Sequence, residues 1–141
     1  MRFYWDTSAA INATVSPAVE ARLETGEHFT RLHLLQEFFS TMTERGIAVK
    51  DRAGQPARMV FAADDAAKWL RDFAGRVTLI ELDGPEMLTA LDAALRLKIK
   101  GPKVYDYGHA LCAAKAKADV VLTRNAKDFA PVVGAARIDW P

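Results

Sequence analysis

The chain has 141 residues, of which 50% are hydrophobic and 26% are charged, and its formal net charge is +1. This length and composition predict one domain over residues 1–141 with a sizeable core. The sequence has no run of about 18 uncharged apolar residues and no basic segment leading into a long apolar run, so we expect neither a membrane-spanning helix nor a signal peptide. A single cysteine, Cys112, excludes an internal disulfide, and its alanine-rich surroundings indicate a buried structural thiol. We therefore expect a cytoplasmic protein without a membrane association.

The first half of the chain predicts one strand, two helices and a loop. Aromatic residues 1–5 predict a buried strand. A helix is expected to start in residues 16–24, with Ser16 as N-cap and Pro17 in the first turn. The next helix is expected over residues 33–46, ending at Gly46. Its apolar face is formed by Leu34, Leu35, Phe38, Phe39 and Met42. Residues 47–60 contain Gly54, Pro56 and mixed charges and predict a loop.

The second half alternates between helices and strands. A helix over 64–75, capped by Asp64 or Asp65 and ending at Gly75, precedes a strand over 77–82. The remaining predictions are a helix over 84–101 with Met87, Leu88, Leu91, Ala94 and Leu95 on one side, a helix in 101–119 that begins near Asp106, and strands at 120–123 and 136–140. This alternation predicts an α/β fold, with a parallel sheet and helices on both faces.

Ligands of such sheets bind beyond the carboxyl ends of the strands. Asp6 follows the first strand, although it could equally cap the following helix, as could Thr7 or Ser8. Glu37 lies on its helix about 60° outside the Leu34 edge of the apolar face. It is either an ordinary residue on the flank of the helix or a residue whose side chain reaches toward a shared site.

The later candidates also have two interpretations each. Asp106 could be the N-cap of its helix, or it could be an acid in the first turn, where the helix dipole stabilises a negative charge. Thr123 and Asn125 follow the strand at 120–123, and Asn125 could form an Asx-turn while Asp128 caps a short turn. The topology nevertheless brings these acids to one edge of one sheet.

Carboxylates that meet at one edge repel one another, and a hard divalent cation such as Mg²⁺ or Mn²⁺ relieves this repulsion. The sequence has no cysteine and histidine set with zinc spacing, and we expect His28, His33 and His109 to be structural or surface residues. Seven basic and two acidic residues lie between Lys98 and Lys127, which indicates a polyanionic partner or an ordinary solvated face.

Three segments, taken in order, resemble a known family. "WDTSA" at 5–9, "LLQEFF" at 34–39 and "VYDYGHALCAAKAKADVVLTRNAKDF" at 104–129 are similar to the PIN-domain family, specifically the VapC-type toxins of bacterial toxin–antitoxin modules. The resemblance implies a three-layer α/β/α sandwich with a mainly parallel sheet. It also implies a Mg²⁺- or Mn²⁺-dependent ribonuclease that cleaves RNA, is held inactive by a cognate antitoxin, and forms a homodimer.

The family's first three acids match Asp6, Glu37 and Asp106. Many members have an aspartate where Asn125 stands in this chain, and Asp128 is the nearest carboxylate. We expect Asp6 and Asp106 to hold the metal, Glu37 to bind it directly or through water, and Asn125 or Asp128 to complete the shell. The residues expected on the substrate side are Thr7, Ser8 and Thr123, which orient a carboxylate or water, and Lys103, Arg124 and Lys127, which hold the RNA backbone.

Two other classes remain open. Asn125 favours a catalytically weakened module that keeps the fold and binds RNA or protein without cleavage. A phosphoacceptor signalling domain has a similar layered shape and an aspartate at a strand end. This second class also needs a lysine at a later strand end, and we find no convincing one.

Overall fold

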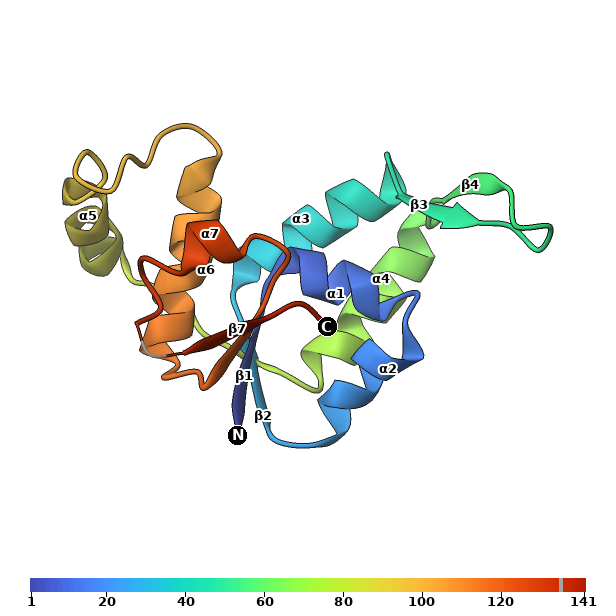
Figure 1. The fold of residues 1–141 in the computed structure, drawn as a ribbon, viewed down its shortest axis with the longest axis horizontal. Coiled ribbons are helices and arrows are strands. Elements are labelled where there is room, and N and C mark those ends of the chain that lie inside the picture. The colour runs from blue at the N-terminus through green and yellow to red at the C-terminus, as the bar shows by residue number, and fades with distance from the viewer. Residues whose placement is uncertain (135) are drawn as a thin grey trace.

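A parallel sheet forms the centre of the computed structural model, which describes residues 1–134 and 136–141. Within these residues the sheet has five strands in the order β5-β2-β1-β6-β7, and every neighbouring pair is parallel (Figure 1). The strands are β1 (Arg2–Trp5), β2 (Glu27–Thr30), β5 (Thr78–Leu79), β6 (Val120–Leu122) and β7 (Arg137–Asp139).

The helices connect these strands. They are α1 (Thr7–Ala13), α2 (Pro17–Glu20), the 3₁₀ turn η1 (Ala21–Glu24), α3 (Leu32–Thr43), α4 (Ala63–Ala74), α5 (Gly84–Asp92), α6 (Lys103–Lys115) and α7 (Ala126–Phe129). None of the helices in the described part of the chain is both long and apolar enough to span a lipid bilayer.

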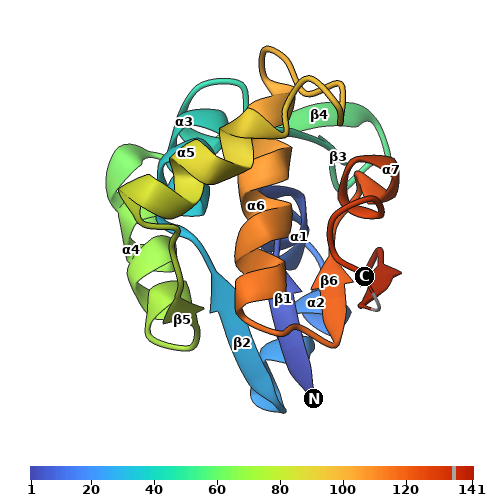
Figure 2. The ribbon, with the colours of Figure 1, turned by 90° about the vertical axis from the view of Figure 1, so that its left-hand side faces the viewer.

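Two hydrophobic cores lie on the two faces of the sheet, because successive residues of a strand point to opposite sides. Trp5 and Leu122 belong to the core beneath α1, α3 and α4, whereas Tyr4 and Val121 belong to the core beneath α6 and α7. Figure 2 shows α6 lying across one face of β1, β2 and β6, with α5 outside it. The predicted α/β fold with a parallel sheet is confirmed, and helices on both faces are compatible with a three-layer sandwich.

The carboxyl ends of β1, β2 and β6 meet at one edge of the sheet. α1 begins directly after β1, α3 begins after β2, and Thr123 follows β6. Figure 1 shows α1, α3, α6 and α7 close to this edge. The three strands therefore deliver residues from three separate parts of the sequence to one edge of the sheet.

The prediction of a loop over 47–60 is wrong. These residues form an antiparallel hairpin of β3 (Ile47–Lys50) and β4 (Pro56–Met59), which projects from the body of the molecule (Figure 1). Asp51 Oδ1 closes the turn by accepting hydrogen bonds from the backbone N–H groups of Ala53 and Gln55. Gly46 leads into the hairpin with a φ of 63°, and a Cβ there would collide with the carbonyl oxygen of Met59.

Several predicted boundaries differ from the observed ones. The helix predicted over 84–101 ends at Asp92, and its predicted apolar side is not buried, since Leu88 is 67% and Leu95 92% exposed. A helix without an apolar contact loses the tertiary packing that normally sustains it. The strand predicted over 77–82 contains only Thr78 and Leu79, and the helix at 33–46 ends three residues early, at Thr43.

The helix termini show smaller differences. Ala62 is the N-cap of α4, and Asp64 and Asp65 lie in its first turn rather than at the cap. α6 begins at Lys103, so Asp106 lies in its first turn. α1 and β2 are absent from the sequence-based prediction. Cys112 is fully buried, as predicted.

Candidate functional site

Asp6 lies at the end of β1 and is 3% exposed. Its Oδ1 accepts a hydrogen bond from the Thr7 backbone N–H at 2.7 Å, which makes it the N-cap of α1. Its Oδ2 accepts from Ser8 Oγ at 2.9 Å and from Thr123 Oγ1 at 2.7 Å. Asp6 therefore caps a helix and also occupies the strand edge, and three donors from two strand ends fix its carboxylate in one orientation.

Glu37 reaches the same edge from α3. Its Oε2 accepts a hydrogen bond of 2.7 Å from Thr7 Oγ1 and lies 3.4 Å from His33 Nε2, one helical turn earlier. The Glu37 side chain is 45% exposed. Thr7 thus contacts Asp6 through its backbone and Glu37 through its hydroxyl, which joins the two carboxylates.

Asp106 is half-buried in the first turn of α6, and its ionisation is opposed by its surroundings. Burial, followed by the negative charges of Asp6, Asp128 and Glu37, raises the pKa of the Asp106 carboxyl to about 6. Four carboxylates from four elements therefore interact at one site. We call Asp6, Glu37, Asp106 and Asp128 the acidic cluster.

Asn125 and Asp128 both belong to this site. Asn125 precedes α7, its backbone N–H donates to Thr123 Oγ1 at 3.0 Å, and its side chain lowers the pKa of Asp106. Asp128 lies in the single turn of α7 and acts on Asp106 through its charge. The structure thus brings both candidates for the fourth position to Asp106, one as an amide and the other as a carboxylate.

The donor chemistry of the acidic cluster fits a divalent cation. Carboxylate and amide oxygens are the ligands that Mg²⁺ and Mn²⁺ prefer, and a cation would remove the repulsion that raises the pKa of Asp106. Among the described residues, no three His, Cys, Asp or Glu side chains are already close enough to hold one ion. Side chains of the acidic cluster would therefore have to come closer together to hold one ion.

Basic side chains flank the acidic cluster on two sides. A pocket of about 410 Å³ between α1 and the β3–β4 hairpin is lined by Arg45, Arg58 and Arg124 together with Ser8. The Arg124 backbone N–H donates to Ser8 Oγ at 3.1 Å, and its guanidinium lies over the Trp140 ring.

A second pocket, of about 230 Å³, adjoins Asp128 and is lined by Lys98, Lys103 and Lys127. The three basic residues expected on the substrate side, Lys103, Arg124 and Lys127, therefore all lie beside the acidic cluster.

The sequence-based prediction misses two histidines at this site. His109 is 1% exposed, and its Nε2 lies 3.8 Å from Asp6 Oδ1. His33 stacks on Tyr105, with ring centroids 4.6 Å apart, and Tyr105 is 51% exposed. The spacing of Asp106 and His109, three residues apart on a helix, was the available signal, because it puts both on one face.

His28, in contrast, is structural as predicted. Its Nδ1 accepts a hydrogen bond from Trp5 Nε1 at 3.1 Å, within the core on the other side of the sheet.

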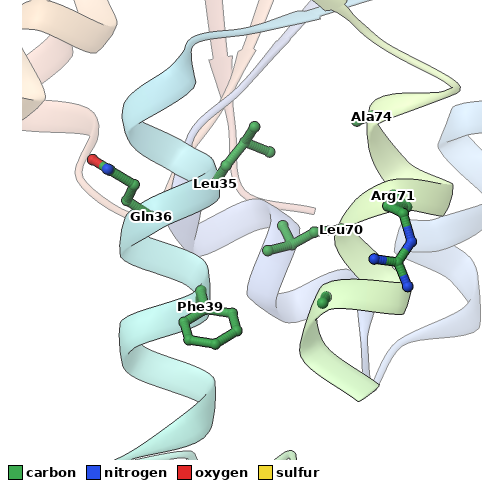
Figure 3. A pocket seen from close by; sticks show the side chains of 7 residues that line it. Leu35, Gln36, Phe39, Leu70, Arg71 and Ala74 are labelled. Carbon is green, nitrogen blue, oxygen red and sulfur yellow. The ribbon is translucent and has the colours of Figure 1, made fainter. Parts of the chain in front are cut away.

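A larger pocket, of about 540 Å³, lies between α3 and α4 and is almost entirely apolar. Figure 3 shows Leu35 and Phe39 of α3 and Leu70 of α4 pointing into the space between the two helices. Its lining contains no carboxylate, hydroxyl or imidazole group. This pocket therefore carries no catalytic chemistry, although it explains why Phe39 of the predicted apolar face is exposed.

Fold and site together define an α/β protein with an acidic cluster at the carboxyl ends of a parallel sheet. Comparison of the sequence with protein-family models gives no match, and comparison with curated proteins gives none either.

Proposed function

We propose that the chain is a Mg²⁺- or Mn²⁺-dependent endoribonuclease with a PIN-like fold. The observation that carries this proposal is the action of three other carboxylates on Asp106 of α6, which come from the end of β1, from α3 and from α7. Carboxylates in this number oppose one another's ionisation, and phosphodiester-cleaving sites use such groups to hold divalent cations.

Each residue has a role in this proposal. Asp6 and Asp106 hold the cation, Glu37 binds it directly or through water, and Asp128 or Asn125 completes the shell. A divalent cation in such a site polarises the phosphate and activates water for attack on phosphorus. Thr7 orients Glu37 and the hydroxyls of Ser8 and Thr123 orient Asp6, as their hydrogen bonds of 2.7–2.9 Å indicate.

The surroundings of the acidic cluster favour a single-stranded nucleic acid as substrate. Arg45, Arg58 and Arg124 line a pocket that reaches Ser8, and arginines bind phosphate oxygens through paired N–H groups. Tyr105 precedes Asp106 and exposes half of its surface while it stacks on His33. An exposed aromatic ring beside a scissile phosphate offers a platform for an unpaired base.

The resemblance to VapC-type toxins adds a cellular role to the proposal. We infer that the ribonuclease acts as a toxin, that a cognate antitoxin protein restrains it, and that the chain forms a homodimer. Expression with and without a small protein encoded next to it tests the inference. Growth arrest without that protein and growth with it support the toxin role, whereas growth in both cases contradicts it.

Asp6→Asn tests the catalytic proposal. Hydroxyl groups both donate and accept, so Ser8 and Thr123 can turn to meet the amide, and the variant is expected to fold. It should lose cation-dependent RNA cleavage by about 100-fold or more, because one cation ligand loses its charge. Mapping of RNA ends, with EDTA as a control, measures the loss.

Asp72→Asn, which changes an exposed aspartate on α4, is the matched control and should cleave like the wild type. A purified Asp6→Asn protein that cleaves RNA normally would show that Asp6 has no role in catalysis.

Asn125 supports a second candidate function. An amide supplies an oxygen but no charge, so a chain with Asn125 at the fourth position binds a cation less strongly than one with aspartate there. The second candidate is a PIN-like module that binds RNA or a partner protein without cleavage. RNA binding without cleavage in Mg²⁺ and in Mn²⁺ would favour it.

A further inference from the structure

His109 Nε2 is a buried polar atom without a hydrogen-bond partner among the described residues. His109 lies on α6 one turn after Asp106, and its side chain is 1% exposed. Asp6 Oδ1 is 3.8 Å from Nε2, which is too long for a hydrogen bond. Leaving such an atom unpaired is unfavourable, so buried polar groups of this kind usually have a partner.

The imidazole ring is held in this orientation from its other side. His109 Nδ1 lies 2.9 Å from the hydroxyl of Tyr4, a fully buried residue on β1. The two rings meet edge to face, with centroids 5.9 Å apart. Rotation of the ring would break the contact with Tyr4, so Nε2 stays directed at Asp6.

Asp6 does not itself form a hydrogen bond with His109 Nε2. Its two oxygens already accept hydrogen bonds from Thr7, Ser8 and Thr123. An ion with bonds of about 2.1 Å to a nitrogen and an oxygen puts these two atoms about 3.0 to 4.2 Å apart, depending on the angle at the ion. The observed 3.8 Å falls within this range.

We propose that His109 Nε2 is a nitrogen ligand of the cation held by the acidic cluster, and that it makes the site prefer Mn²⁺ to Mg²⁺. Mg²⁺ selects oxygen ligands, whereas transition-metal ions also accept imidazole nitrogen. In this arrangement Nδ1–H donates to the Tyr4 oxygen, which leaves the lone pair of Nε2 free. The inference rests on the proposed function, since it needs a cation at the acidic cluster.

Burial supports a neutral imidazole. The His109 side chain is 1% exposed, and an apolar core disfavours a charged imidazolium. A neutral ring is the form in which histidine binds metals.

The experiment uses Mn²⁺ alone and Mg²⁺ alone as probes. Calorimetry gives the two affinities, and pulsed electron paramagnetic resonance of bound Mn²⁺ detects a coordinated nitrogen. We expect nitrogen coupling in the wild type and its loss in His109→Asn, whose shorter side chain can still meet the Tyr4 hydroxyl. Mn²⁺ affinity should fall about tenfold or more, while Mg²⁺ affinity should change less than about twofold.

His33→Asn is the matched control, because His33 Nε2 lies 3.4 Å from Glu37 and is the competing nitrogen. It should keep the nitrogen coupling. Loss of the coupling in His33→Asn with retention in His109→Asn would overturn the inference, as would wild-type Mn²⁺ binding without nitrogen coupling. Equal losses of Mn²⁺ and Mg²⁺ affinity in His109→Asn would also overturn it, by reducing His109 to a residue that positions Asp6.

The spectra of the wild type and of His33→Asn decide the question even where His109→Asn does not fold, because coupling that persists in His33→Asn cannot come from His33. Failure of the wild type to bind either ion would reject the proposed function itself. Binding of both ions without nitrogen coupling would reject the role of His109 alone.

Discussion

At the scale of single residues, the proton on Asp106 links the acidic cluster to stability. The pKa of this carboxyl rises from 3.8 to about 6 through burial and the charges of Asp6, Asp128 and Glu37. Between these two values the folded chain binds a proton that the unfolded chain releases. The stability from this proton is fully present below about pH 4 and is lost as the pH rises through about 6.

Asp106→Asn should therefore stabilise the cation-free protein at neutral pH. We expect a gain of about 1 kcal/mol above pH 6, well below the full value of the pKa shift because the side chain is only half-buried and water screens its charge. The gain should shrink toward zero near pH 4. Urea unfolding of both proteins in EDTA at several pH values measures it, and a gain independent of pH would contradict the assignment.

At the scale of elements, the β3–β4 hairpin extends the basic surface beside the acidic cluster. Arg58 Nε donates to the Arg45 carbonyl oxygen at 2.7 Å and ties β4 to the end of α3. This contact holds the hairpin beside α1, where the two arginines and Arg124 line one pocket with Ser8. The hairpin therefore forms one wall of the path by which a polyanion would reach Asp6.

Arg45→Gln should weaken the binding of single-stranded RNA without changing cation binding. Loss of one phosphate contact reduces the slope of log affinity against log salt by about 0.7. Fluorescence anisotropy in EDTA, which prevents cleavage, measures this slope at several salt concentrations.

Arg71→Gln, which changes an arginine in the α3–α4 pocket, is the control and should keep the wild-type slope. Equal slopes in all three proteins would place the RNA on another surface.

At the scale of the whole molecule, the proposed cation would connect elements from the first and last parts of the chain. The acidic cluster draws on the end of β1, on α3, on α6 and on α7, and the repulsion among its carboxylates opposes their ionisation in the folded state. Anything that binds the folded state alone stabilises it in proportion to the logarithm of its concentration.

Mn²⁺ at ten times its dissociation constant should thus raise the free energy of unfolding by about 1.4 kcal/mol. EDTA should reverse the gain, and Asp6→Asn should abolish it. Thermal unfolding with and without Mn²⁺ measures the effect. An unchanged melting temperature in the wild type at saturating Mn²⁺ would contradict a cation site in the folded chain.

Most of the sheet is predictable from the sequence. The aromatic run ending at Trp5 and the compact apolar run from Val120 to Leu122 are short and flanked by polar residues, so local pattern identifies them as strands. The hairpin is not predictable in this way, because its strands, IAVK and PARM, contain no aromatic residue and each includes a basic residue. The early end of α5 depends on the absence of a packing partner for Leu95, which is a tertiary property.

The residues of the candidate site also differ in whether the sequence alone identifies them. Asp6 could be named from the sequence because it directly follows a strand, and Asp106 because an acid in the first turn of a helix that packs on the sheet lies near the strand ends. His109 could not, because a histidine in an alanine-rich helix is usually part of the core. Its proposed role depends on the 3.8 Å distance between its unpartnered Nε2 and Asp6 Oδ1, which only coordinates reveal.

The central place of β1 in the sheet has a consequence for biosynthesis. β1 leaves the ribosome early, yet one of its two neighbours, β6, begins at Val120. The hydroxyl that Thr123 donates to Asp6 comes from 117 residues further along the chain. A growing polypeptide therefore carries Asp6 without β6 beside it until Val120 and the residues after it have been synthesised, and a product that stops short of Thr123 lacks the hydrogen bond that fixes Asp6 Oδ2 from that side.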